Sequence, residues 1–213
     1  MINTVLTILF FLIVIGFIVL AIVNILRPIL GMRGIVSAMI DVTKGWQAFA
    51  NRHGLKFIPT GNREQGITGS YQGFPINISG LPHPDADGKL NFDKNSGFDT
   101  LVEITLHSPL EGMLTIQEAS AGNPASSTPL PGTYTTGDPA FDKRFCVSSQ
   151  PEKIASHLLG DLQMRKELVA NPAYNSLQAS GDRLVYRQTG LVTEVEDLQY
   201  LTDLLCKVAG DLE

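Results

Sequence analysis

The feature that most constrains this chain is an apolar run near its start. The twenty-two residues from Val5 to Leu26 contain no charged side chain, and Arg27 and Pro28 follow them directly. As a helix this run would measure roughly 33 Å, which is enough to cross the hydrocarbon core of a bilayer. A soluble buried helix rarely stays apolar on every face over this length. We therefore expect residues 1–30 to form a transmembrane anchor, with the lipid bilayer as its partner.

A cleaved signal peptide is the alternative explanation of the run. Three features disfavour it, because residues 1–4 contain no Lys or Arg, the run exceeds the usual apolar region of about 7–15 residues, and no A-x-A-like cleavage site follows. The sequence therefore favours an anchor that is retained.

The basic residues near the run predict its orientation. Arg27, Arg33 and Lys44 lie on its C-terminal side, opposed only by Asp41. The positive-inside rule then places the remaining chain in the cytoplasm. Because the bias is only three residues, the opposite orientation, with the domain exported, stays open.

Composition narrows the possible functions of the rest of the chain. The net charge is −5 and the pI is near 5.3, so no basic stripe is available for nucleic acid. Cys146 and Cys206 are too few for a disulfide framework or a zinc site, and we expect reduced thiols. Because no catalytic fingerprint such as G-x-S-x-G, a Walker A loop or C-x-x-C occurs, we predict no catalytic, cofactor or metal site and favour a non-enzymatic protein.

The alternation of apolar and polar residues predicts one α+β domain over residues 31–213. Helices are expected over 34–53, from a capping box at 149–152 to residue 169, and from a second capping box at 193–196 to the end. Strands are expected over 66–71, 74–79, 100–107, 113–118, 141–147, 176–179 and 183–188. Short connections and the lack of βαβ alternation indicate a mostly antiparallel sheet packed by about three helices.

The predicted helix over 34–53 carries an apolar stripe that allows two interpretations. Ile35, Met39 and Trp46 lie on it at three- and four-residue spacing. They are candidate interaction residues for lipid headgroups or a membrane-protein partner. Packing of the stripe on the domain's own sheet is favoured, because Asp41 and a single Lys make a poor lipid-binding face.

The most polar segment of the chain begins at His83. Asp85, Asp87 and Gly88 occupy positions three, five and six of a calcium-binding loop, but His83 stands at position one and Lys94 at position twelve. Two essential oxygens are missing, so a solvated turn is favoured. A membrane-tethered hydrolase or a ligand-binding sensor using His83, Asp85 and Asp87 is the alternative function.

A second pair of polar residues also allows a catalytic interpretation. Glu103 and His107 alternate onto the same strand face, where they would form a general-base pair or simply a polar surface. The surface interpretation is favoured.

The segment from Gly137 to Phe145 has the pattern Gly-Asp-x-x-Phe-Asp-x-x-Phe. It resembles a segment of uncharacterised bacterial membrane-anchored proteins, and residues 67–73 resemble the small hairpin that those proteins carry. The resemblance implies a bacterial source and an intracellular domain anchored in the inner (cytoplasmic) membrane, and it implies no activity. On structural grounds Phe141 and Phe145 would be core anchors, with Asp138 and Asp142 accepting from turn amides. The leading hypothesis is a single-pass accessory protein, a small subunit of a larger membrane assembly.

Overall fold

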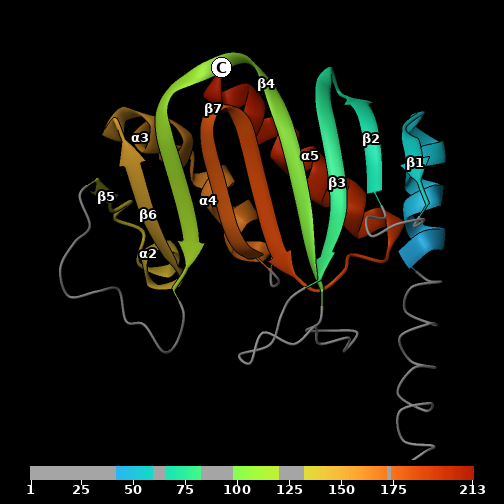
Figure 1. Cartoon of the computed structure of the whole chain (residues 1–213). Coiled ribbons are helices and arrows are strands. Elements are labelled where there is room, and N and C mark those ends of the chain that lie inside the picture. The colour runs from blue at the N-terminus through green and yellow to red at the C-terminus, as the bar shows by residue number, and fades with distance from the viewer. Residues whose placement is uncertain (1–41, 60–65, 83–97, 120–131, 172–173) are drawn as a thin grey trace, which may run out of the picture. The chain divides into compact units, whose positions relative to one another are not determined.

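The computed structural model describes residues 42–59, 66–82, 98–119, 132–171 and 174–213. These residues form a seven-stranded sheet with helices packed against one face (Figure 1). All pairings between its named strands are antiparallel, which confirms the α+β class and the mostly antiparallel sheet. The described residues contain five helices where about three were predicted.

The predicted anchor over residues 1–30 lies outside the described ranges and stays a prediction. Within those ranges, no helix combines the length and the hydropathy that spanning a membrane requires. Ile35 and Met39 also lie outside them.

The first described helix covers residues 42–53 and turns its apolar stripe inward. Trp46 and Phe49 are fully buried, and the Trp46 Nε1–H donates to the Val192 carbonyl at 2.7 Å. Gly54, with φ at +67°, ends the helix as the predicted C-cap. The structure thus shows the packing alternative for Trp46, which belongs to the core and offers no surface to lipid or a partner.

The next three strands form a meander. They are β1 (Lys56–Ile58), β2 (Gly66–Tyr71) and β3 (Phe74–Pro82). Gln72 and Gly73 both have positive φ, as a tight two-residue hairpin requires, and this confirms the predicted turn. Pro75 lies in β3, which is an interior strand between β2 and β4. The register with β4 begins only at Ile76, so the missing N–H of Pro75 interrupts no bond of that ladder.

The centre of the sheet consists of two nested arches, β4 (Phe98–Glu118) and β7 (Tyr174–Thr189) (Figure 1). Residues 100–105 in the first arm of β4 pair with residues 183–188 in the second arm of β7. Residues 113–117 in the second arm of β4 pair with residues 176–180 in the first arm of β7. Val102, Ile104 and Leu106 face the core as predicted. Residues 108–112 were predicted as a turn between two strands, but they form the bend of one continuous strand, where the register shifts. We call this bend the crest of β4.

The segment after β5 (Thr133–Tyr134) corrects one prediction. Residues 141–147 were expected to form a strand, but the chain forms the helix α2 (Pro139–Arg144) and then the strand β6 (Phe145–Gln150). Asp138 caps α2 and Pro139 occupies its first turn. These are helix-start signals, and they outweigh the short apolar run that follows them.

The helix predicted to end at residue 169 is two helices, α3 (Glu152–Gly160) and α4 (Leu162–Ala170). Asp161 separates them and caps α4 by accepting from the Gln163 N–H at 2.9 Å. Leu162, the first residue of α4, is 49% exposed. The predicted Ser149 cap is also wrong, because Ser149 lies inside β6 and its hydroxyl accepts instead from the Ala155 N–H.

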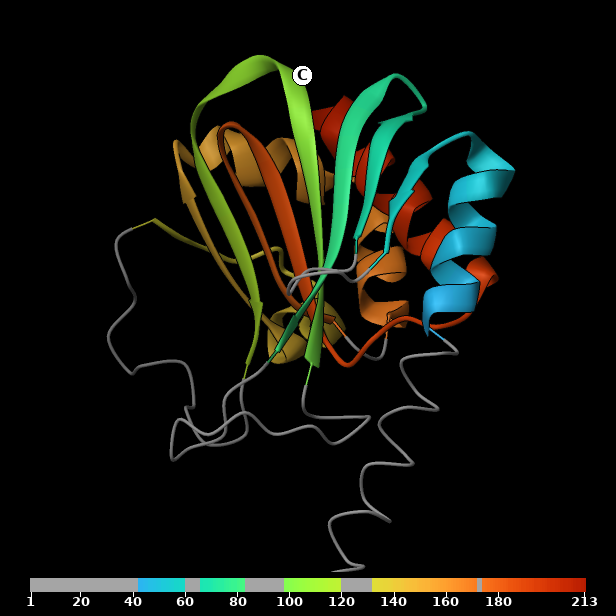
Figure 2. The same cartoon turned by 45° about the vertical axis from the view of Figure 1, so that its right-hand side comes forward.

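The last helix, α5 (Val195–Leu212), packs along the sheet as predicted. Leu198, Leu201, Leu205 and Val208 are buried, although no side chain caps its N-terminus. Figures 1 and 2 show α4 and α5 on the same side of the sheet. The other face of the sheet is covered by no described helix or strand, and we call it the open face.

Candidate functional site

The calcium-like loop with His83, Asp85 and Asp87 lies outside the described residues, so the alternative functions that use it stay predictions. Among the residues that the structure does describe, no group of three or more His, Cys, Asp or Glu side chains is placed to hold a metal ion.

The general-base pair of Glu103 and His107, which was the disfavoured alternative, does not form. The His107 Nδ1 lies 3.0 Å from the Glu213 Oε1 at the end of the chain, while Glu103 forms an ion pair with Arg183 at 3.7 Å. The N–H groups of His107 and Ser108 also donate to the Glu213 carboxylate. Burial raises the pKa of the Glu213 carboxyl, but these hydrogen bonds outweigh it and hold the pKa below its ordinary value.

The Gly137–Phe145 segment is structural, as the second interpretation of its residues predicted. Phe141 and Phe145 are buried with ring centroids 4.9 Å apart. Asp142 accepts from the Thr136 N–H, the Thr136 hydroxyl and the Gly137 N–H at 2.8–3.0 Å.

Asp138 satisfies the amides at the start of α2 from the other side of the same segment. It accepts from the N–H groups of Ala140 and Phe141 and forms an ion pair with Arg165. Burial raises the pKa of the Asp138 carboxyl, but the two amide bonds and Arg165 outweigh it and lower that pKa.

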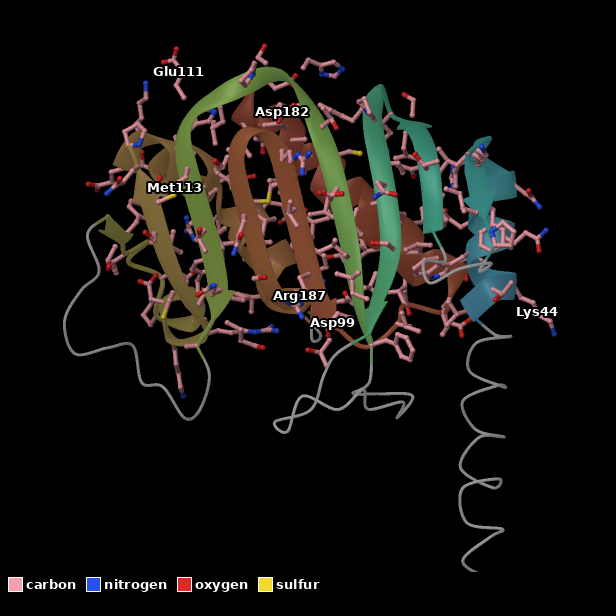
Figure 3. All side chains as sticks on the ribbon, in the orientation of Figure 1. Lys44, Asp99, Glu111, Met113, Asp182 and Arg187 are labelled. Carbon is pink, nitrogen blue, oxygen red and sulfur yellow. The ribbon has the colours of Figure 1, made fainter. Side chains whose placement is uncertain are left out.

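A hollow among the described residues lies beneath the crest of β4, and we call it the crest pocket. Three segments line it, namely residues 108–111 of the crest, four residues of α3 (Lys153, Ile154, Ser156 and His157), and residues 211–213 at the end of α5. Its volume is about 620 Å³, which is within the range of small-molecule sites. Figure 3 shows Glu111 beside the crest of β4.

The crest pocket combines an apolar base with charges of both signs. Ile154 is 8% exposed, and Leu110 and Leu212 pack against the core. Lys153 and His157 come from α3, one helical turn apart, whereas Glu111 and Asp211 come from the crest and from α5. The pocket can therefore offer an apolar contact together with hydrogen-bond donors and acceptors.

The open face is the second feature of functional interest. Asp99 is almost fully buried at its lower end and accepts from the Arg187 Nε at 2.7 Å, and the two side chains lie together in Figure 3. Their ion pair and the Glu103–Arg183 pair join the facing arms of β4 and β7. These charges hold the sheet together, and we assign them no ligand.

The crest pocket was missed in the sequence because its parts are distant along the chain. The segment over 108–112 was interpreted only as a turn, and the α3 residues only as one side of a helix. The local signal, Lys153 and His157 at a four-residue spacing, is common on solvated helix faces.

Comparison with known proteins shows a shared fold. No model of a protein family and no curated protein matches this sequence. The structure is similar to the crystal structure of the mycobacterial trehalose monomycolate transport factor A, TtfA, with a TM-score of 0.54. The match covers 81% of this chain and 94% of that chain, at 9% sequence identity. At this identity the similarity concerns the fold and transfers no residue role.

Proposed function

We propose that this chain is a single-pass, membrane-anchored accessory factor of a membrane transport system, with its α+β domain in the bacterial cytoplasm. The observation that carries the proposal is the shared fold with a transport factor over most of both chains. The apolar run from Val5 to Leu26 supports the anchor, and the basic residues after it support the cytoplasmic orientation.

In this function the domain acts by binding rather than by chemistry. Its partner is a membrane protein of the same assembly, and its cargo is a lipid, by analogy with the named cargo of the structural neighbour. Ile35 and Met39 are the proposed contacts to that partner or to lipid headgroups, because Trp46 is occupied in the core.

Gene deletion and complementation test the proposal. Deletion in the source organism should reduce delivery of newly made envelope lipid, measured by radiolabelling followed by separation of the envelope fractions. The full chain should restore delivery, and a chain lacking residues 1–30 should not. A chain in which an unrelated single-pass helix replaces residues 1–30 is the matched control and should restore delivery.

Two results would refute the proposal. One is an unchanged lipid distribution after deletion. The other is full restoration by the chain that lacks residues 1–30, because a domain that works without an anchor is not a membrane-tethered factor.

A further inference from the structure

The crest pocket holds four ionisable side chains that are not paired with one another. Lys153 and His157 line it from α3, while Glu111 and Asp211 line it from the crest of β4 and from α5. Among the described residues, none of the four side chains makes an ion pair or a hydrogen bond. The fifth ionisable group, Glu213, is already engaged by the backbone and ring of His107.

The separation of the charges is a property of the fold. Lys153 and His157 share one helix, and the acidic residues belong to two other elements that line the pocket. The basic and the acidic side chains therefore come from different elements. The pocket is also lined by Leu110, Ile154 and Leu212, which are held in place by contact with the core.

This arrangement discriminates between classes of ligand. A simple anion attracted by Lys153 would be repelled by Glu111 and Asp211, and a simple cation attracted by these carboxylates would be repelled by Lys153. A molecule with both charges can contact the acidic and the basic side chains at once, and its apolar part can cover the apolar lining of the pocket. Complementarity of this kind gives specificity as well as affinity.

We propose that the crest pocket binds a small zwitterion, with its ammonium group beside Glu111 and Asp211 and its carboxylate or phosphate beside Lys153 and His157. Two sources share this chemistry, a free apolar amino acid and the phosphoethanolamine headgroup of a phospholipid. The inference goes beyond the proposed function and does not depend on it, because a binding measurement on the purified chain requires no transport.

Isothermal titration calorimetry on the full-length chain in detergent tests the binding. The probes are leucine and glycerophosphoethanolamine, compared with ethanolamine and inorganic phosphate, which each carry only one of the charges. At least one zwitterion should bind at least tenfold more tightly than either single-charge probe. Binding of leucine alone identifies an amino acid site, and binding of glycerophosphoethanolamine alone identifies a headgroup site. If neither zwitterion exceeds the single-charge probes by this factor, the proposal is wrong.

Charge-removing variants locate the binding. Lys153→Gln and Asp211→Asn should each weaken the zwitterion about tenfold or more, because each removes one charge-assisted contact. Lys166→Gln on α4 and Asp197→Asn at the start of α5 change the net charge equally at exposed positions outside the pocket, and they should change the affinity less than about twofold. All four sites are on the protein surface or close to it, so circular dichroism should show the same fold. Equal affinities for the pocket variants and the controls would overturn the assignment.

Discussion

The hydrogen bond between Trp46 and Val192 can be tested by replacing the indole with a smaller aromatic ring. Trp46 is 0% exposed, and its Nε1–H donates to the Val192 carbonyl at 2.7 Å. This bond joins the helix over 42–53 to the segment that leads into α5. The change Trp46→Phe keeps an aromatic group in the core but removes both the donor and part of the ring.

Two contributions determine the expected loss of stability. A buried carbonyl that loses its donor costs about 1–3 kcal/mol. The smaller ring leaves a void of roughly 40 Å³, which at about 24 cal/mol per Å³ adds about 1 kcal/mol. We therefore expect Trp46→Phe to lower the free energy of unfolding by about 2–4 kcal/mol, a large part of the roughly 5–15 kcal/mol that holds an ordinary domain folded.

Urea unfolding of the full-length chain in detergent, followed by far-ultraviolet circular dichroism, measures this loss. The chain contains one Trp, so the variant has no indole fluorescence to follow. Tyr200→Phe is the control, because Tyr200 is 47% exposed and should change stability by no more than about 0.5 kcal/mol.

The membrane-contact interpretation of Trp46 predicts the opposite pattern. In that case Trp46→Phe would be as stable as the wild type, and the wild-type indole emission would shift when lipid vesicles are added. Observing both results would refute the placement of Trp46 in the core and the loss of stability calculated from its burial.

Three further predictions concern other parts of the fold. Gly112→Ala should lower the free energy of unfolding in urea by about 2–4 kcal/mol, because φ is +142° and the new Cβ would lie 2.1 Å from the Gln150 carbonyl oxygen. Gly160→Ala is the control: its Cβ would meet nothing within 4 Å, so the change should be neutral or slightly stabilising. Asp138 has a lowered pKa, so its contribution to stability is present at neutral pH and disappears below about pH 4. Asp138→Asn should therefore flatten the acid side of the curve of stability against pH. An unchanged curve would contradict this. Burial and Asp203 raise the pKa of the Cys206 thiol to about 11. A thiol reagent at pH 8 should therefore label the half-buried Cys146 before the buried Cys206. Equal labelling rates in the native protein would count against the burial of Cys206.

Local patterns in the sequence were sufficient where one physical signal dominated. Strict alternation identified the inward residues of β4, and Gln72-Gly73 identified the hairpin, because two positive φ angles favour such a pair. The four-residue spacing of Phe141 and Phe145 was recognised as two core anchors but assigned to a strand. Both a helix and a strand can bury such a short run, and the cap supplied by Asp138 decided in favour of the helix.

The sequence by itself determined the α+β class, the stripes that become the core and the expectation of an N-terminal anchor, because each depends on the order of apolar and polar residues along a short segment. Only the tertiary structure decided that Trp46 lies in the core, that Glu213 rather than Glu103 contacts His107, and that a crest, a helix and a chain end enclose one pocket. These contacts join residues separated by tens of positions or more along the chain. No periodicity within a single helix or strand encodes such a meeting.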